Sequence, residues 1–370
     1  MIHLDHAATS FPKPSEVVAA VERWFRELGV SPGRGDGEST RTVAREVHVA
    51  RAGIARLSGV PTDRVAFTSG ATESLNLALR AVLQPGDRVL TTAFEHSSVA
   101  RVLNALARQQ GLQVEVLAPD ARGTIDVDTA RETLGRLRPR LFVFTHASNV
   151  TGAVLPAAEL CALARGHGAL SLLDASQTAG LLPLAVGADL VAASAHKSLH
   201  APPGLGFLAA RPGLELPSQK QGGTGSSLAL EEHPTEWPLA FEAGTPNTPA
   251  ILGLAAALRW VEHHTQAKLL ARAEDAMAVL RERLVANPRV RLLLPQCQVL
   301  PVLSFVRTDM DPAEAGMLLD ARGIHVRTGF HCAPWVHRHL GTETGGTVRI
   351  SVGPSLSAAD VEQASAALGD

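Results

Sequence analysis

The sequence predicts an α/β protein with a large domain built on a mostly parallel seven-stranded sheet, followed by a small α+β domain. Short apolar, β-branched runs alternate with helical patterns between about residues 60 and 210. This alternation is typical of βαβ units whose sheet is covered on both faces. Residues 219–249 are rich in Gly, Pro, Ser and Thr and are too long for an ordinary connection, so they mark a domain boundary or a functional loop.

The first two thirds of the chain contain the elements of the large domain. Two amphipathic helices are expected ahead of the sheet, at Glu16–Leu28 and Arg41–Leu57, because apolar residues recur there at helical spacing. The strands are expected at Arg64–Ser69, Arg88–Ala93, Gln113–Ala118, Leu141–Ala147, Leu170–Ala175, Leu190–Ser194 and Gly206–Ala209. The helices between them are expected at Thr72–Leu83, Val99–Gln110, Val127–Leu137 and Ala157–His167.

The last third of the chain mixes helical and strand patterns. The helices are expected at Ala250–His263, Ala267–Val285, Pro312–Ala321 and Ala358–Leu368. The strands are expected at Val290–Leu294, Leu300–Arg307 and Val348–Val352. We therefore expect a large domain over residues 12–248 and a small domain over residues 249–370, to which residues 1–11 also belong.

Composition and charge exclude several classes of protein. Hydrophobic residues make up 45% and charged residues 19% of the chain, unlike disordered, collagen-like or coiled-coil proteins. With 34 Lys plus Arg against 36 Asp plus Glu, the chain has no electrostatic signature for nucleic acid or an anionic membrane. It has no long apolar run, no secretion signal and no CxxC pair among its three cysteines, so we expect a cytosolic protein. The absence of Tyr excludes Tyr–Lys dehydrogenases. The chain also contains neither GxxxxGK[ST] nor a strand followed by GxGxxG, so the usual sequence evidence for a nucleotide-binding loop is missing.

A lysine and a carboxylate follow neighbouring predicted strands. Lys197 lies just after the strand that ends at Ser194, and Asp174 ends the strand before it. In parallel sheets such residues meet at the edge where ligands bind. This pair suits pyridoxal 5′-phosphate (PLP), because a lysine forms its Schiff base and a carboxylate keeps its pyridine nitrogen protonated.

Other polar residues at the same edge complete a candidate cofactor site. Ala71 and Thr72 open a helix directly after a strand, where free N–H groups and the helix dipole favour a phosphate. Ser194 and His196 can add donors to that phosphate, and His96 follows another strand and can stack on the pyridine ring. Because the chain lacks Tyr, the candidates to hydrogen-bond the ring oxygen are Asn149 and Gln177.

These residues recur together in class V PLP enzymes of fold type I, and the chain most resembles the cysteine desulfurase/selenocysteine lyase family. The motifs that carry the resemblance span nearly the whole chain in the family's order. They are LDHAATSFPKP (Leu4–Pro14), TSGATESLN (Thr68–Asn76), EHSS (Glu95–Ser98), HASNVTG (His146–Gly152), DASQ (Asp174–Gln177), SAHK (Ser194–Lys197), FEAGTPNT (Phe241–Thr248) and RTGFHCAP (Arg327–Pro334).

The resemblance implies further roles. It implies a homodimer in which Thr245 of one subunit reaches the phosphate in the other, and it implies that Arg349 holds the substrate carboxylate, as a guanidinium can do bidentately. Arg34 lies where the family's pattern differs, so its role in substrate binding is open. Cys332 matches the cysteine that attacks the substrate sulfur, and cationic neighbours at His331 and Arg327 are expected to favour its thiolate.

The function implied is conversion of L-cysteine into L-alanine. Lys197 acts as the general base at Cα, and Cys332 takes the sulfur as a persulfide that passes to an acceptor protein or a small thiol. Three alternatives stay open: a selenocysteine lyase, another class V lyase, epimerase or transaminase in which Cys332 is not the nucleophile, and a scaffold without cofactor. A zinc site is disfavoured, since the nearby histidines lack a second cysteine or a carboxylate.

Overall fold

The large sheet organises most of the molecule in the computed structural model, which describes residues 1–33, 35–225 and 231–369. Within these residues the sheet has seven strands in the order β2-β8-β7-β6-β5-β3-β4, and every neighbouring pair is parallel except those made by β8. Their bounds are β2 (Val65–Thr68), β3 (Arg88–Thr92), β4 (Gln113–Leu117), β5 (Leu141–Thr145), β6 (Leu170–Asp174), β7 (Leu190–Ser194) and β8 (Gly206–Ala210). The predicted α/β fold with a mostly parallel seven-stranded sheet is confirmed.

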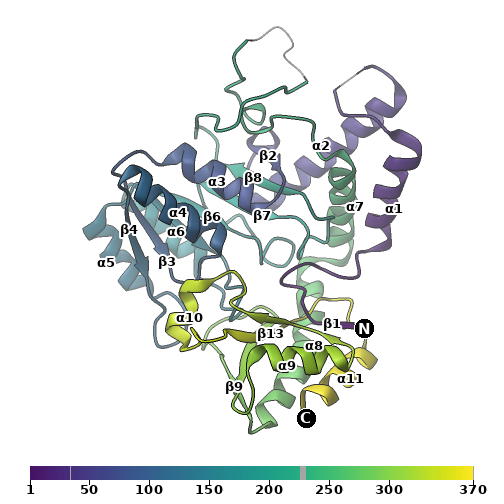
Figure 1. Ribbon diagram of the computed structural model, residues 1–370. Coiled ribbons are helices and arrows are strands. Elements are labelled where there is room, and N and C mark those ends of the chain that lie inside the picture. Colours follow the sequence, from purple (N-terminus) through teal and green to yellow (C-terminus); the bar gives the residue numbers. More distant parts are fainter. Residues whose placement is uncertain (34, 226–230, 370) are drawn as a thin grey trace.

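Helices cover both faces of this sheet (Figure 1). One face packs on α3 (Ala71–Val82) and α4 (Ser97–Gln110). The other face packs on α2 (Glu38–Ser58), α5 (Val127–Leu137), α6 (Ala157–Gly166) and α7 (Thr248–His264). The strands alternate between the two cores: Phe142 and Phe144 of β5 face one, and Val143 faces the other. This burial on both faces explains why the strands read as continuous apolar runs.

A smaller antiparallel sheet lies below the large one in Figure 1. Its strands are β9 (Val290–Leu292), β10 (Val302–Arg307), β12 (Arg327–Gly329) and β13 (Thr347–Ser351), in the order β12-β13-β10-β9. It packs on α8 (Gln266–Ala286), α9 (Pro312–Ala321) and α11 (Ala358–Gly369). The N-terminal strand β1 (Ile2–His3) pairs in parallel with β11 (Ile324–His325), so the start of the chain lies beside the small sheet.

The structure differs from the sequence prediction in two places. The predicted helix at Glu16–Leu28 is α1 (Ser15–Arg23) followed by a π-helical turn at Trp24–Leu28, which ends at Gly29 with φ of 59°. The sequence did not predict the short elements β1, β11, β12 and α10 (Pro334–Leu340). Segments of two to seven residues are too short to show the repeating spacing of apolar residues that identifies a helix or a strand. The domain boundary at residue 248 stays a prediction; α7, which begins there, packs on the core of the large sheet.

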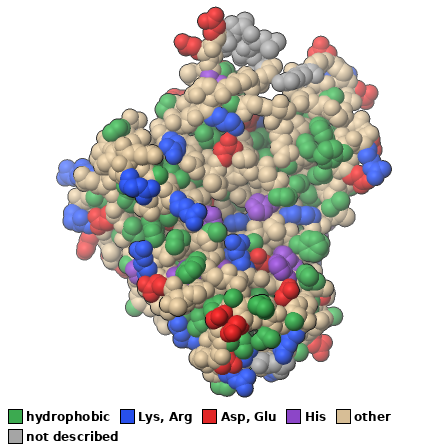
Figure 2. Space-filling view, in the orientation of Figure 1, with side chains coloured by type: hydrophobic (Ala, Val, Ile, Leu, Met, Phe, Trp, Pro, Cys, Tyr) green, Lys and Arg blue, Asp and Glu red, His purple; other side chains and the backbone are tan. Residues whose placement is uncertain are grey.

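Histidine, lysine and arginine side chains gather across the middle of the face shown in Figure 2, between the two sheets. The described part of the chain contains no helix that is both long and apolar enough to span a membrane.

Candidate active site

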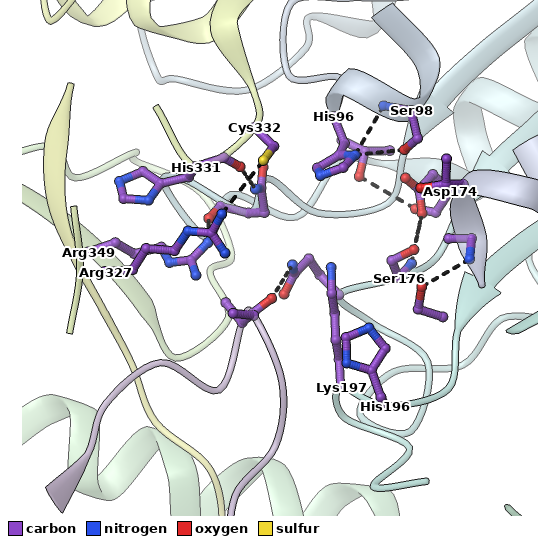
Figure 3. A pocket seen from close by; sticks show the side chains of 18 residues that line it. His96, Ser98, Asp174, Ser176, His196, Lys197, Arg327, His331, Cys332 and Arg349 are labelled. Atoms are coloured by element: carbon purple, nitrogen blue, oxygen red, sulfur yellow. Dashed lines mark hydrogen bonds between the residues drawn. The ribbon is translucent and has the colours of Figure 1, made fainter. Parts of the chain in front are cut away.

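A cavity of about 210 Å³ lies where the large and small sheets meet. It opens at the carboxyl ends of the parallel strands, the edge where ligands bind in such sheets. The ends of β6 and β7 and the first turns of α3 and α4 form one side, and β12, β13 and the loop that carries Cys332 form the other (Figure 3).

Lys197 lies three residues beyond β7 and lines the cavity. Burial lowers the pKa of its amine to about 8, and the nearby Asp174 carboxylate opposes this shift. The guanidinium groups of Arg349 and Arg327 lower the pKa further. At neutral pH far more of Lys197 is therefore the free amine than of an ordinary lysine, and this is the form that attacks a carbonyl carbon or accepts a proton.

Asp174 ends β6 and is 3% exposed. Ser176 fixes its orientation, since the backbone N–H and the hydroxyl of Ser176 both donate to Oδ1, at 2.9 and 2.5 Å. A buried carboxylate held in this way can accept a hydrogen bond from a cationic ring nitrogen.

The first turn of α3 supplies an anion-binding corner. The backbone of β8 crosses it so closely that a Cβ at Gly206 would lie 2.6 Å from the Gly70 backbone, so only glycine fits there. Ser194 Oγ accepts from Ala71 N at 3.0 Å, and the exposed Thr72 also lines the cavity.

His196 and His96 are both neutral. Burial lowers the pKa of each to about 4, with Lys197 contributing in both cases. Nδ1 of His196 is buried and has no hydrogen-bond partner among the described residues, which leaves it available to a ligand. His96 caps α4: its Nδ1 accepts from Ser98 N at 3.1 Å, so its ring is held at a fixed angle at the cavity wall (Figure 3).

The two predicted amides both line the cavity, and each uses part of its NH₂ group within the protein. Asn149 Nδ2 donates to the carbonyl oxygen of His331 at 2.6 Å. Gln177 Nε2 donates to the carbonyl oxygen of Ala7 at 3.1 Å. Each NH₂ group has a second hydrogen, which can donate to a ligand.

Arg349, on β13, is 1% exposed and also lines the cavity. Its Nη2 pairs with the Asp5 carboxylate and its Nη1 donates to the carbonyl oxygen of Asn149 at 2.9 Å. Nε is buried without a partner within the described ranges. The guanidinium is therefore oriented in advance, and its Nε remains uncommitted for an anionic ligand.

The loop that carries Cys332 is anchored to the first residue of α4. Cys332 and His331 both have positive φ, 58° and 48°, which is uncommon outside glycine. The carbonyl oxygen of Cys332 accepts from Ser97 N at 2.6 Å, while the Cys332 side chain is exposed. Arg327 Nη2 lies 3.6 Å from Cys332 Sγ, within hydrogen-bonding distance of the sulfur.

The expected cationic role of His331 is wrong. Burial and the neighbouring Arg349 lower the pKa of His331 to about 2, and its Nε2 is paired with Thr347 Oγ1 at 2.8 Å. The imidazole is thus neutral and part of the core, so of the two predicted cationic neighbours only Arg327 can act on Cys332. A sequence shows the residue type but not its burial.

The donors in the cavity fit PLP. The partly free amine of Lys197 matches the aldehyde, and the fixed carboxylate of Asp174 matches the pyridine nitrogen. The phosphate is matched by the N–H and hydroxyl donors at the N-terminus of α3 and by the unpartnered imidazole nitrogen of His196. No group of three or more His, Cys, Asp or Glu side chains in the described ranges could hold a metal ion.

Of the remaining two predicted residues, one lies outside this cavity and the other is not described by the structure. Thr245 is exposed and lines a neighbouring cavity of about 170 Å³ with Ser69 and Lys220, so within one chain it does not reach Lys197. Arg34 lies outside the described residues. Sequence reasoning missed the roles of Ser176 and Asp5, although both belong to motifs that it singled out.

Several known proteins resemble this chain along nearly its whole length. The model of the family described as "Aminotransferase class-V" matches residues 2–364. A probable cysteine desulfurase from Pseudomonas aeruginosa is 35% identical over 98% of this chain and 92% of its own. A cysteine desulfurase from Escherichia coli is 31% identical over 90% of this chain and 84% of its own. The apo structure of a cysteine desulfurase from Thermococcus onnurineus superposes with a TM-score of 0.92, at 29% identity, over 100% of this chain and 94% of its own.

Proposed function

Because the chain belongs to the class V aminotransferase family and resembles cysteine desulfurases along nearly its whole length, we infer that it is a PLP-dependent cysteine desulfurase. It converts L-cysteine to L-alanine, and the sulfur leaves on the thiol of Cys332. The observation that carries this assignment is that one cavity contains Lys197, Asp174 and Cys332.

Five groups of this chain would hold the cofactor. Lys197 would bind its aldehyde carbon, Asp174 its pyridine nitrogen, and the first turn of α3 with Ser194 and His196 its phosphate. When bound, PLP supplies an electron sink that stabilises negative charge at the substrate Cα. The neutral ring of His96 lies at the cavity wall, where it can stack on the pyridine ring.

The substrate is oriented by its carboxylate. Arg349 has an uncommitted Nε, and its guanidinium is fixed by Asp5. Asn149 can donate its second amide hydrogen to the same carboxylate or to the ring oxygen. With the carboxylate held there, the amine of Lys197 removes the proton from Cα, a role that suits a pKa of about 8.

Cys332 takes the sulfur. Its sulfur, which lies 3.6 Å from Arg327 Nη2, forms a bond with the substrate sulfur while the carbon–sulfur bond of the substrate breaks. The electron pair of the broken bond goes to the carbon, which is protonated, so alanine and a Cys332 persulfide form without an external oxidant or reductant. The exposed position of Cys332 supports onward transfer to an acceptor protein or a small thiol.

A homodimer would complete the site. The exposed Thr245 lies outside the cavity of its own chain, where the partner subunit's phosphate could meet it.

The test is alanine release from L-cysteine by the PLP-loaded protein, with mass spectrometry of the Cys332 peptide. We expect alanine and one added sulfur on Cys332, both lost in Cys332→Ala and both kept in the control Cys297→Ala, which changes a thiol outside the cavity. Alanine release that survives Cys332→Ala contradicts the role of Cys332. The same comparison with L-selenocysteine shows whether selenium release dispenses with the thiol.

A further inference from the structure

Four donors converge on the carbonyl oxygen of His196, the residue before Lys197. Ser10 N lies 3.0 Å from this oxygen, Thr9 Oγ1 3.1 Å, Ser10 Oγ 3.2 Å and Lys13 Nζ 2.7 Å. A carbonyl oxygen has two lone pairs, so these donors exceed what it normally accepts. The shortest contact is the one made by a cation, and hydrogen bonds from cations are the strong ones.

Lysine, the residue type at position 13, is rare in this chain. Only four of the 34 Lys plus Arg residues are lysines: Lys13, Lys197, Lys220 and Lys268. Lys13 is half-buried, and burial lowers the pKa of its amine to about 8. Its Nζ also donates to Ser10 Oγ at 2.7 Å, so both contacts are made by one compact ammonium group.

The contact bears directly on the catalytic lysine. The carbonyl of His196 and the N–H of Lys197 belong to one planar peptide group, so holding the oxygen holds the Cα of Lys197. The peptide group on the other side of Lys197 is held as well, because its carbonyl oxygen accepts from His200 N at 2.8 Å.

The same N-terminal segment contacts the other side of the cavity. Asp5 pairs with Arg349 of β13 on that side, while the carbonyl oxygen of Ala7 accepts from Gln177 Nε2 on the side of the large sheet. Residues 5–13 therefore connect the group that orients the substrate carboxylate with the backbone of Lys197. A shift at either end of this segment would change the distance between the base and the substrate Cα.

We propose that Lys13 is a positioning residue, whose ammonium fixes the His196 carbonyl and thereby places the amine of Lys197 for proton removal. The inference rests on the proposed function of the cavity. Lys13 does not line the cavity, so it acts through the backbone of Lys197 and not on the substrate.

Four variants test the proposal. Lys13→Met keeps the aliphatic stem and removes the donors, whereas Lys13→Arg keeps a cationic donor. Thr9→Val removes one neutral donor to the same oxygen and is the mild variant if Lys13→Met folds poorly. Lys268→Met is the control, because Lys268 is exposed on α8. The readouts are kcat and KM for alanine release, the rate at which bound PLP is lost, and Tm.

We expect Lys13→Met to lower kcat about tenfold or more, which is the order that a lost charge-assisted hydrogen bond gives, and to leave KM within about twofold. It should also speed PLP loss. Thr9→Val should change both in the same direction by less, Lys13→Arg should recover most of kcat, and Lys268→Met should match the wild type.

A lower Tm with kcat within about twofold of the wild type overturns the proposal and makes Lys13 a purely structural residue. A rise in KM at constant kcat also overturns it, since that result places Lys13 in substrate binding. If the wild type releases no alanine, the proposed function fails, and the rate of PLP loss still tests the placement of Lys197 by Lys13.

Discussion

Glu95 is a fully buried carboxyl group that the mechanism does not use, and it leads to a sharp prediction. It lies between the ends of β3 and β5, where its Oε1 accepts from Thr92 Oγ1 at 2.6 Å and from Thr145 N at 3.0 Å. Its Oε2 has no partner among the described residues. Burial raises the pKa of Glu95 from 4.5 to about 8, with the charge of Asp174 adding to the rise and the two hydrogen bonds opposing it. Glu95 is therefore protonated at neutral pH.

The consequence for stability has a definite sign. In the unfolded chain Glu95 loses its proton near pH 4.5, whereas in the folded protein it keeps the proton up to about pH 8. Its contribution therefore falls as the pH rises through this window, and the loss between pH 5 and pH 8 is about 3–4 kcal/mol. Glu95→Gln has no proton to lose, so its stability relative to the wild type should rise by this amount from pH 5 to pH 8.

The assay is urea unfolding of the PLP-loaded wild type and Glu95→Gln at pH 5, 6, 7 and 8, at one protein concentration because association shifts the midpoint. Histidines with lowered pKa values change stability in the opposite direction, but they are common to both proteins and cancel in the difference. The control is Glu232→Gln, an exposed glutamate whose replacement should leave the pH dependence unchanged.

Parallel stability curves for Glu95→Gln and the wild type between pH 5 and 8 would refute the reasoning. Infrared spectroscopy gives a direct check. The wild type should show the C=O band of a buried carboxylic acid at pH 6 that fades as the pH passes about 8, and Glu95→Gln should lack it. A wild type without this band at pH 6 has an ionised Glu95.

Three further predictions follow from single contacts. Asp174→Asn should bind PLP but lose at least about 100-fold in kcat for alanine release, the order that a lost electrostatic stabiliser gives, because the amide cannot hold a charged ring nitrogen; a kcat near that of the wild type would contradict this. Arg349→Lys should raise KM about tenfold or more, because an ammonium cannot contact Asp5 and the substrate in the same fork, and steady-state kinetics at saturating PLP measures it. Gly353→Ala should lower Tm, because its Cβ would lie 2.0 Å from the His6 ring, and adding His6→Ala should restore most of the loss; an unchanged Tm in Gly353→Ala would show that the ring has room to move.

Local pattern was enough to predict most of the large domain. The strands at Arg88–Thr92 and Leu190–Ser194 are short apolar runs between turn residues, and a period of two or 3.6 residues is a property of neighbouring positions. The same holds for Lys197 and Asp174, because the end of a parallel strand can be read from the chain and all such ends meet at one edge of the sheet. The strand at Arg327–Gly329 was missed because three residues cannot establish a period.

The sequence by itself determined the α/β fold, the motifs of the family and the residue types that the cofactor chemistry needs. Only the tertiary structure decided the protonation and the hydrogen-bond partners of these residues. Burial makes His331 neutral, and Asp5 reaches Arg349 across 344 positions of the chain. The convergence of Lys13 and its neighbours on the carbonyl oxygen before Lys197 joins residues 183 positions apart. Protonation and hydrogen bonding depend on distance and on exclusion of water, and neither can be read from residues that meet only when the chain folds.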